Sequence, residues 1–414
     1  MGDPFWHSQS ENLAASRSER PASPARAVVL ACCFILTCSG CLSDPAASSL
    51  PSTESALPPT ASSASTGTPI DMPTPTATPA PHGKFTSVGS LAYQDGAWGG
   101  AFLLADGRVL VVAPEFADAQ TYDPTTGKFS PYQLPAIANA DTAMPLPDGR
   151  WLVFGIDNHL SILDLENHRV TPAGAMEPDR QGDFVTVQLT DGRILIAGGT
   201  DKSGQHYLTS AEIYDPATFK FAPTGSMLEG RESQTAILLP DGKVLIAGGD
   251  RGTGAAEDIL STAELYDPAT GKFTATGRLT MPRTSFDDIL LPDGRVLLIG
   301  GFGRGTVALA GADIYDPATS KFTATGSMAN ARVNFTATLL KDGRVLVTGG
   351  DQMNETALAT AEIYDPATGT FSPTGAMLTA RTDHDAILLR DGSVLVYGGQ
   401  NESGGQPTAE LYWP

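Results

Sequence analysis

One phrase recurs seven times after residue 83 and restricts the chain to a repeat architecture. It begins Leu-Leu-x-Asp-Gly-Arg-Val-Leu-Val and, after a glycine pair and a variable stretch, continues Ala-Glu-Ile-Tyr-Asp-Pro-Ala-Thr-Gly-Lys-Phe. Its Asp-Gly pairs, 42 to 52 residues apart, begin at Asp106, Asp148, Asp191, Asp241, Asp293, Asp342 and Asp391. Units of this length each form one supersecondary element and bury their apolar faces against their neighbours.

Each unit contains four short runs of β-strand character, named here strands A to D in chain order. Asp-Gly between apolar runs predicts a hairpin turn between A and B, because both residues tolerate a positive φ. Asp-Pro-Ala-Thr-Gly predicts a second tight turn, between C and D. We therefore expect an all-β domain over residues 83–414, a seven-bladed β-propeller of four-stranded antiparallel blades.

The two ends of the repeat region complement each other. The sequence stops after a strand C that no strand D follows. A matching strand D stands at the other end, where residues 83–91 repeat the pattern of residues 271–279. The N-terminal strand is therefore predicted to complete the last blade and close the ring.

The repeat resembles the kelch motif in three features: a glycine pair, a Tyr-Asp-Pro after it, and an arginine before strand A. The glycine pairs are 198/199, 248/249, 300/301, 349/350 and 398/399. Family tryptophans after the second turn are replaced by Phe221, Phe273, Phe322 and Phe371. Blades 1 and 2 carry Ala113-Pro114 and Gly155-Ile156 instead of the glycine pair. The resemblance implies a propeller similar to the central domain of galactose oxidase.

The region before the repeats predicts an export signal and a tether. Residues 27–38 are a 12-residue apolar run behind several arginines, which is typical of a signal peptide. The run ends in Cys38-Ser39-Gly40-Cys41, which resembles a bacterial lipobox, although Cys38 stands where an aliphatic residue is usual. The resemblance implies a lipoprotein signal peptide over 1–41 and a lipid on Cys41; without lipobox cleavage the protein would be secreted.

Residues 42–82 are rich in Pro, Ser and Thr and contain no Lys or Arg. Such a composition predicts a disordered linker. We therefore expect an extracytoplasmic protein that touches a membrane only through its lipid.

Charge and cysteine usage exclude several function classes. The formal net charge is −20, and the residues before Cys41 are neutral, so the acidity lies in the later part and disfavours nucleic-acid binding. All four cysteines lie between residues 32 and 41, which excludes disulfides and cysteine-ligated metals from the repeats. No zinc spacing, P-loop or nucleotide fingerprint occurs. We expect no metal, no cofactor and a monomer.

Five blades carry an arginine four residues beyond the end of strand D and an acid two residues before the Tyr-Asp-Pro tyrosine. The pairs are Arg180 with Glu212, Arg231 with Glu264, Arg283 with Asp313, Arg332 with Glu362 and Arg381 with Glu410. The arginines could form a ring for a carboxylate or phosphate ligand. Blades 1 and 2 lack arginine, acid and glycine pair together, which favours a structural ion pair that reaches over the glycines.

In a four-stranded meander, the D-to-A and B-to-C connections share one face of the ring, here called the loop-rich face. Sequence differences collect there, so this is where we expect ligand contact. The candidate ligand-binding residues at the starts of strands A are Asp183, Gln234, Phe286, Asn334, Phe335, Asp383 and His384. They suit stacking and hydrogen bonding to a sugar, and equally a water-filled channel; His384 alone is not expected to ligate a metal.

Two enzyme classes with propeller folds fit poorly. Copper-radical oxidases similar to galactose oxidase need a Tyr joined to a Cys and two metal-bound histidines, which the repeats do not offer. The Ser-x-Asp-x-Gly-x-Thr-Trp boxes of sialidases are absent. The sequence favours a non-catalytic binding or scaffolding module that contacts a glycan or a surface protein. The alternative is a kelch-type sugar mutarotase or epimerase with acid–base groups such as Arg381, Asp383 or His384.

Overall fold

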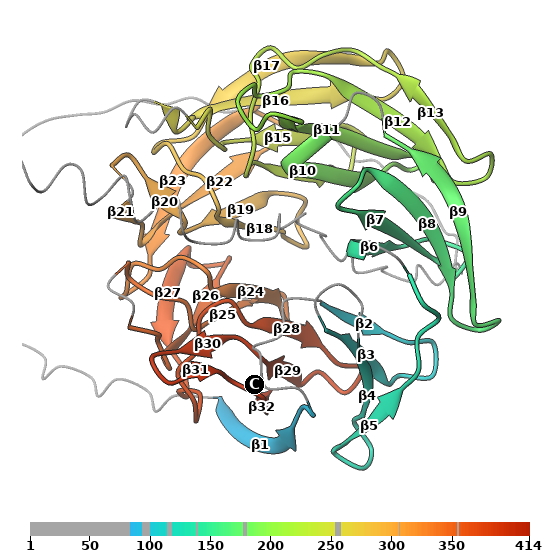
Figure 1. Ribbon diagram of the computed structural model, residues 1–414. Coiled ribbons are helices and arrows are strands. Elements are labelled where there is room, and N and C mark those ends of the chain that lie inside the picture. The colour runs from blue at the N-terminus through green and yellow to red at the C-terminus, as the bar shows by residue number, and fades with distance from the viewer. Residues whose placement is uncertain are drawn as a thin grey trace, which may run out of the picture. The chain divides into compact units, whose positions relative to one another are not determined.

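The computed structural model describes residues 83–92, 100–113, 118–137, 140–176, 180–252, 258–305, 307–353 and 356–414. The expected signal peptide, Cys41 and the linker 42–82 lie outside these residues. The described strands form seven four-stranded antiparallel sheets arranged in a ring (Figure 1). The predicted all-β, seven-bladed propeller is confirmed. No helix in the described part of the chain is long and apolar enough to cross a membrane.

Strands A lie nearest the centre of the ring, and B, C and D follow outward. The strands A are β2 (Ala101–Leu103), β6 (Ala140–Pro145), β10 (Arg180–Gln188), β14 (Thr235–Leu238), β18 (Asp287–Leu290), β24 (Thr336–Leu339) and β28 (Asp385–Leu388). The strands B are β3 (Val109–Val112), β7 (Trp151–Gly155), β11 (Ile194–Asp201), β15 (Val244–Ala247), β19 (Val296–Ile299), β25 (Val345–Thr348) and β29 (Val394–Tyr397).

The outer strands complete each blade. The strands C are β4 (Ala119–Asp123), β8 (His159–Asp164), β12 (Ala211–Asp215), β16 (Thr262–Asp267), β22 (Gly311–Asp316), β26 (Ala361–Asp365) and β32 (Thr408–Trp413). The strands D are β5 (Lys128–Tyr132), β9 (Arg169–Ala175), β13 (Lys220–Pro223), β17 (Lys272–Arg278), β23 (Lys321–Ser327), β27 (Thr370–Pro373) and β1 (Lys84–Ser90). Two hairpins rise from B-to-C connections: β20 (Phe302–Gly303) with β21 (Val307–Ala308), and β30 (Gln400–Asn401) with β31 (Gly404–Gly405).

The last blade is closed by the first strand, as predicted. Its sheet has the order β1-β32-β29-β28. Lys84 pairs with Trp413 and Phe85 with Tyr412 in an antiparallel register, and the Trp413 indole N–H donates to Thr86 Oγ1 at 3.1 Å. Two distant segments of the chain therefore share one sheet.

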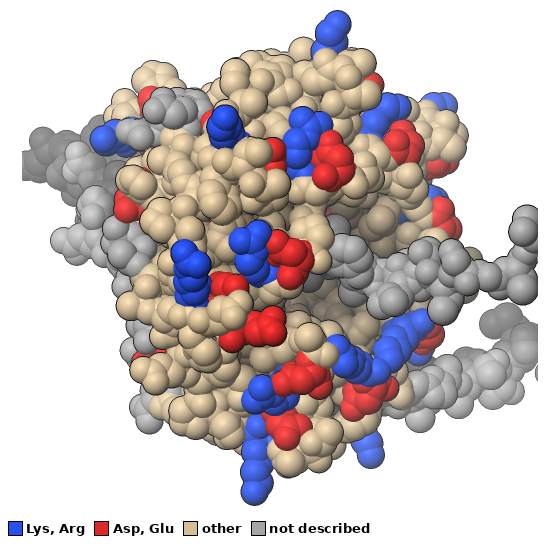
Figure 2. All heavy atoms as spheres, turned by 90° about the vertical axis from the view of Figure 1, so that its right-hand side faces the viewer, with Lys and Arg blue, Asp and Glu red and all other residues tan. Residues whose placement is uncertain are grey.

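Turn chemistry explains why the blades form hairpins. At the A-to-B turn, Asp106 Oδ1 accepts the backbone N–H of Arg108 at 2.9 Å, and Gly107 takes a φ of 90°. At the C-to-D turn, Asp215 Oδ1 accepts the backbone N–H of Ala217 at 2.9 Å. These turns share the face opposite the loop-rich face, here called the turn face. Figure 2 looks at that side, where Lys and Arg alternate with Asp and Glu.

The hydrophobic core lies between blades. Strands B read as unbroken apolar runs because both of their faces are covered; all four side chains of β15 are 0% exposed. One core cluster joins Val185 and Leu195 of blade 3 to Val244 and Ile246 of blade 4. Each described blade interface is filled by such a cluster, so a blade depends on its neighbours for burial.

Candidate functional site

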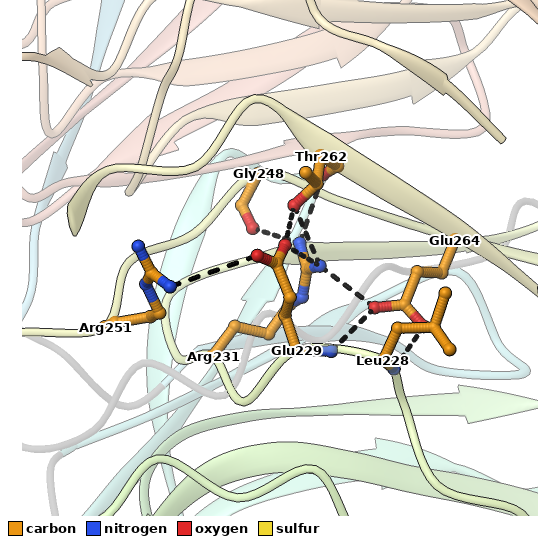
Figure 3. A network of polar contacts seen from close by, with 7 residues as sticks. All are labelled: Leu228, Glu229, Arg231, Gly248, Arg251, Thr262 and Glu264. Atoms are coloured by element: carbon orange, nitrogen blue, oxygen red, sulfur yellow. Dashed lines mark hydrogen bonds and ion pairs between the residues drawn. The ribbon is translucent and has the colours of Figure 1, made fainter. Parts of the chain in front are cut away.

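The five register arginines are buried and bonded within their own blades. Figure 3 shows the case of Arg231, whose Nη1 donates to Gly248 O at 2.7 Å and whose Nη2 lies 3.0 Å from Glu264 Oε1. Glu264 also accepts the backbone N–H of Leu228 at 2.8 Å. The guanidinium-to-carboxylate distances are 3.3, 3.0, 3.4, 2.7 and 2.8 Å for Arg180–Glu212, Arg231–Glu264, Arg283–Asp313, Arg332–Glu362 and Arg381–Glu410.

This burial favours the structural interpretation of the arginines over a ligand-binding ring. The Arg231 side chain is 0% exposed, and burial lowers its pKa while the Glu264 charge opposes that shift. A guanidinium in this position stays charged because its intrinsic pKa is far above neutrality. The arginines therefore hold the blades together and do not present their charge to a ligand.

Four of the five arginines, all except Arg180, also link two blades through their backbone. The second glycine of a pair donates its N–H to the carbonyl oxygen of the next blade's arginine, as Gly249 does to Arg283 at 2.9 Å. The same bond joins Gly199 to Arg231 at 2.8 Å and Gly350 to Arg381 at 2.9 Å. The arginine side chain thus bonds within its own blade, and its carbonyl oxygen accepts a hydrogen bond from the preceding blade.

The glycine pair serves both its own blade and the next one: its first carbonyl oxygen accepts the arginine of its own blade, and its missing Cβ makes room for the following blade. A Cβ built on Gly248 would lie 2.7 Å from Cε1 of Phe286 and 2.6 Å from the carbonyl oxygen of Arg283, both in the following blade. Gly248 also has a φ of 65°, which side chains rarely adopt. Glycine is needed here because strand A of the neighbour passes so close.

Four of the candidate ligand-binding residues fill these blade interfaces. Gln234, Phe286, Phe335 and His384 are only 2, 6, 3 and 0% exposed. Each packs over the first glycine of the preceding blade's pair. The His384 Nε2 lies 3.0 Å from Thr348 Oγ1 and 3.2 Å from Thr336 Oγ1. We therefore assign these four side chains a packing role and place the accessible mouth elsewhere.

The other three candidates take part in backbone hydrogen bonds between neighbouring blades on the loop-rich face. Ser233 N–H donates to Asp183 O at 3.1 Å, and Ser285 N–H to Ser233 O at 3.2 Å. Further round, Asp383 N–H donates to Asn334 O at 2.9 Å. Ser233, Ser285, Asn334 and Asp383 all have a φ of 49 to 55°. This left-handed step turns their side chains away from those of the buried residues that follow.

Asn334 and Asp383 are bonded to neighbouring loops. The Asn334 amide donates to Asp351 Oδ2 at 3.1 Å, and the Gln400 amide donates to Asp383 Oδ2 at 3.1 Å. Thr382 Oγ1 donates to the same oxygen of Asp351 at 2.8 Å. On this side of the mouth, between blades 6 and 7, the polar groups mainly satisfy one another.

A group of acids and one tyrosine from blades 3 and 4, here called the acidic cluster, is mostly absent from the candidates that the sequence offered. Its members are Asp183, Tyr207, Glu232 and Asp250. Tyr207 and Glu232 share a side-chain hydrogen bond, and Glu232 Oε2 lies 2.5 Å from the place of a Cβ on Gly182. The signal in the sequence was a carboxylate directly after Arg231, where the other such blades have Gln181, Thr284, Val333 and Thr382.

Glu232 has the most strongly shifted pKa within the acidic cluster. Burial raises its pKa to about 7, and the carboxylates of Asp250 and Asp183 add to the shift. Burial also raises the pKa of Asp250 and raises that of Tyr207 to about 12. A carboxyl group with a pKa near neutrality can exchange a proton at physiological pH.

Exposed apolar side chains gather on the loop-rich face. Eight large ones are exposed among the described residues, and six of them lie in B-to-C or D-to-A connections. These six, here called the apolar rim, are Ile156, Leu228, Met281, Val307, Met353 and Leu378. They belong to connections of blades 2 to 7. Leu228, Val307 and Leu378 are 60 to 63% exposed.

Comparisons with known proteins agree with this geometry. The Kelch motif family model matches residues 184–228. Two curated galactose oxidases of Gibberella zeae are 31% identical over 130 residues, which is 29% of this chain and 19% of theirs. The match thus spans about a fifth of those relatives. The chain is a kelch-repeat β-propeller.

Two solved structures share the fold of this kelch propeller. A fungal alcohol oxidase of the AA5 family in complex with copper has a TM-score of 0.60 at 19% identity, over 79% of this chain and 77% of the other. The structure of YjhT has a TM-score of 0.53 at 13% identity, over 67% and 95%. At these identities the likeness concerns the fold alone.

The copper site of that oxidase is not assigned to this kelch propeller. In the described ranges, no three His, Cys, Asp or Glu side chains gather as metal ligands. The four cysteines lie between residues 32 and 41, before the described part begins. The residues that the structure describes therefore do not fit a copper site.

Proposed function

We propose that this protein is a non-catalytic binding module that contacts another protein through its loop-rich face. The observation that carries the proposal is the apolar rim. Aliphatic side chains exposed together on one face favour burial against a partner, because exposed apolar surface is costly in water. Sugars offer mainly hydroxyl groups, so the rim favours a protein over a glycan.

The turn face is less suited to partner contact than the loop-rich face. Its repeated turns carry exposed ion pairs, such as Arg108 with Asp106 at 2.7 Å and Arg295 with Asp293 at 2.7 Å. Such pairs are well hydrated and contribute little to binding. The proposal includes the export signal and the lipid at Cys41, which would display the propeller on a bacterial envelope behind the 42–82 linker.

Site-specific photocrosslinking in cells tests the contact. A photoreactive phenylalanine analogue placed at Val307 or Leu378 should capture a discrete protein adduct. The same analogue at Lys128 or Lys220, both exposed in strands D toward the turn face, should capture none or only scattered products. Leu378→Glu should then abolish the adduct formed from Val307. Equal capture from both faces, or no adduct from the rim, would refute the proposal.

One observation favours a second candidate, a carbohydrate-active enzyme of the mutarotase or epimerase type. Glu232, with a pKa of about 7 and Tyr207 beside it, has the properties of a general acid–base group. The purified protein would be mixed with freshly dissolved anomers of a sugar panel and followed by NMR. Faster anomer exchange that Glu232→Gln removes would support catalysis; rates equal to the buffer control would exclude it for those sugars.

A further inference from the structure

We infer that Met281 and Met353 of the apolar rim form a modification site, where peroxide oxidises both thioethers to sulfoxides and thereby weakens the contact with the partner. This inference rests on the proposed function and names how that contact is regulated. Which methionines react depends on the propeller alone. What their oxidation changes depends on the partner, so the two parts are tested separately.

The methionines of the described residues divide into two groups. Five belong to the core clusters between blades and are at most 6% exposed: Met144, Met176, Met227, Met328 and Met377. Met281 and Met353 are 44 and 47% exposed, and both belong to the apolar rim. Oxidation of a methionine follows the access of oxidant to its sulfur. A peroxide should therefore react with the rim methionines first and leave the core packing intact.

A tight turn presents Met353 to solvent. Asp351 Oδ1 accepts the backbone N–H of Met353 at 2.8 Å, and Met353 has a φ of 70°, which is uncommon for a residue with a long side chain. Asp351 is only 8% exposed. Its Oδ2 accepts the Asn334 amide at 3.1 Å and Thr382 Oγ1 at 2.8 Å. The exposed position of Met353 is thus fixed by bonds from blades 6 and 7.

A second buried acid holds the connection that carries Met281. Thr280 N–H donates to Asp313 Oδ2 at 3.1 Å, and Asp313 is the buried partner of Arg283. The Met281 Sδ lies 3.9 Å from the place of a Cβ on Gly311. The corresponding connections before the other register arginines of blades 4, 6 and 7 have polar residues at this position, namely Glu229, Asn330 and Thr379. The repeat itself therefore does not require an apolar residue here.

The modification needs only the thioether and hydrogen peroxide. The sulfur attacks one peroxide oxygen, an S–O bond forms as the O–O bond breaks, and the other oxygen leaves as water with both protons. Sulfur loses two electrons, and the peroxide gains them. The sulfoxide is polar, and burying a polar group without a hydrogen-bond partner is costly. A partner held by apolar contact therefore binds the oxidised rim more weakly, and methionine sulfoxide reductases reverse the change.

Peptide mapping by mass spectrometry tests which methionines react. The purified protein would be treated with hydrogen peroxide and sampled over time. We expect Met281 and Met353 to be oxidised at least about tenfold faster than Met227 and Met328. The melting temperature should be unchanged while only the two rim methionines are oxidised. Equal rates at all four sites would overturn the inference, whatever the partner is.

Photocrosslinking tests what the oxidation changes. Protein with the photoreactive analogue at Val307 would be treated with peroxide, freed of it, and mixed with an envelope extract that was never oxidised. The yield of the Val307 adduct should fall at least about fivefold, and treatment with the reductases should restore it. An unchanged yield would overturn the inference and leave the proposed function standing. Absence of the adduct without peroxide would overturn both.

Variants assign the effect to the two sulfurs. Each variant is compared with its own untreated sample, so that only its sensitivity to peroxide is measured. Met281→Leu with Met353→Leu should make the adduct yield independent of peroxide. Met328→Leu, which replaces a buried methionine, should keep the sensitivity of the parent protein. Sensitivity that persists in the double variant would overturn the inference.

Discussion

His384 of blade 7 packs against Gly349 of blade 6, with its Cε1 only 2.6 Å from the place where a Cβ would stand. The same relation joins Phe286 to Gly248 and Phe335 to Gly300. A large side chain of one blade thus occupies the volume that a side chain of the preceding blade would need. The interface is a close fit in which one partner must lack a Cβ.

Replacing such a glycine should lower the free energy of unfolding by more than the strain of a positive φ alone would cost. Gly248→Ala should lower the free energy of unfolding by more than 3 kcal/mol, because it adds a clash with Phe286 to the cost of a positive φ. Gly204→Ala is the matched control, since Gly204 has a φ of 66° but no atom within 4 Å of its Cβ position. Urea unfolding of both variants checks this, and equal losses would contradict it.

Breaking one buried ion pair should destabilise the protein strongly. Glu264→Ala leaves Arg231 buried without its carboxylate and should cost about 3 to 5 kcal/mol. The double variant Arg231→Met with Glu264→Leu should recover much of that loss, because no charge is then left unpaired. Asp241→Asn, in an exposed pair with Lys243, should change stability by no more than about 1 kcal/mol. A similar small effect at Glu264 would contradict a structural role for the pair.

The closing strand should work equally well from the other end of the chain. A variant that begins at Leu91 and carries Ala-Thr and residues 83–90 after Pro414 recreates the turn Pro-Ala-Thr-Gly-Lys-Phe. Because Lys84 already pairs with Trp413 as Lys272 pairs with Asp267, β1 should re-enter the same register. Circular dichroism and thermal melting should match the parent domain. Simple deletion of residues 83–90 should instead expose β32 and lower the melting temperature, and equal melting would contradict the closure.

Asp288 should make stability depend on pH. It is 5% exposed, accepts a hydrogen bond from Thr235, and burial raises its pKa to about 7. The folded state thus binds a proton more tightly than the unfolded chain, where an Asp pKa is about 3.9. The free energy of unfolding should fall as pH rises from about 4 to about 7, by up to about 1.4 kcal/mol per pH unit.

Urea unfolding between pH 4 and pH 8 checks this dependence. Asp288→Asn should remove most of the decline, while Asp241→Asn at an exposed turn should keep it. Glu232 titrates in the same range with the same sign, so a residual slope in Asp288→Asn should disappear in the double variant with Glu232→Gln. An unchanged slope in all variants would show that neither carboxyl is responsible.

The fold was predictable because its determinants are local. Asp-Gly and Asp-Pro-Ala-Thr-Gly specify tight turns by their own φ preferences, and the apolar runs between them recur at one period. The last blade lacks a strand D in its own repeat, and residues 83–91 at the start of the repeat region have the pattern of a strand D. The ion pairs could be inferred because arginine, acid and glycine pair occur or are missing together.

The site was harder to predict because it depends on approaches between blades. The left-handed backbone at Ser233 and Asp383 determines which of two adjacent side chains faces the mouth. A positive φ at these positions cannot be predicted from the residue types Ser and Asp. The bulge in β10 between Gln181 and Phe184 moves Asp183 out of the repeat register. The high pKa of Glu232 arises from burial and from groups on two blades, which no spacing within a repeat reveals.

The double attachment of Arg231, Arg283, Arg332 and Arg381 has a consequence for how such a ring can change in evolution. Repeats 4 to 6 each bring an arginine side chain that bonds to their own strands, an arginine carbonyl that accepts from the glycine of the preceding repeat, and a glycine pair that makes room for the following repeat. A tandem duplication of one repeat would therefore deliver a complete new interface in a single event. Gain or loss of whole blades is then a smaller step for this chain than a point substitution at one of these glycines.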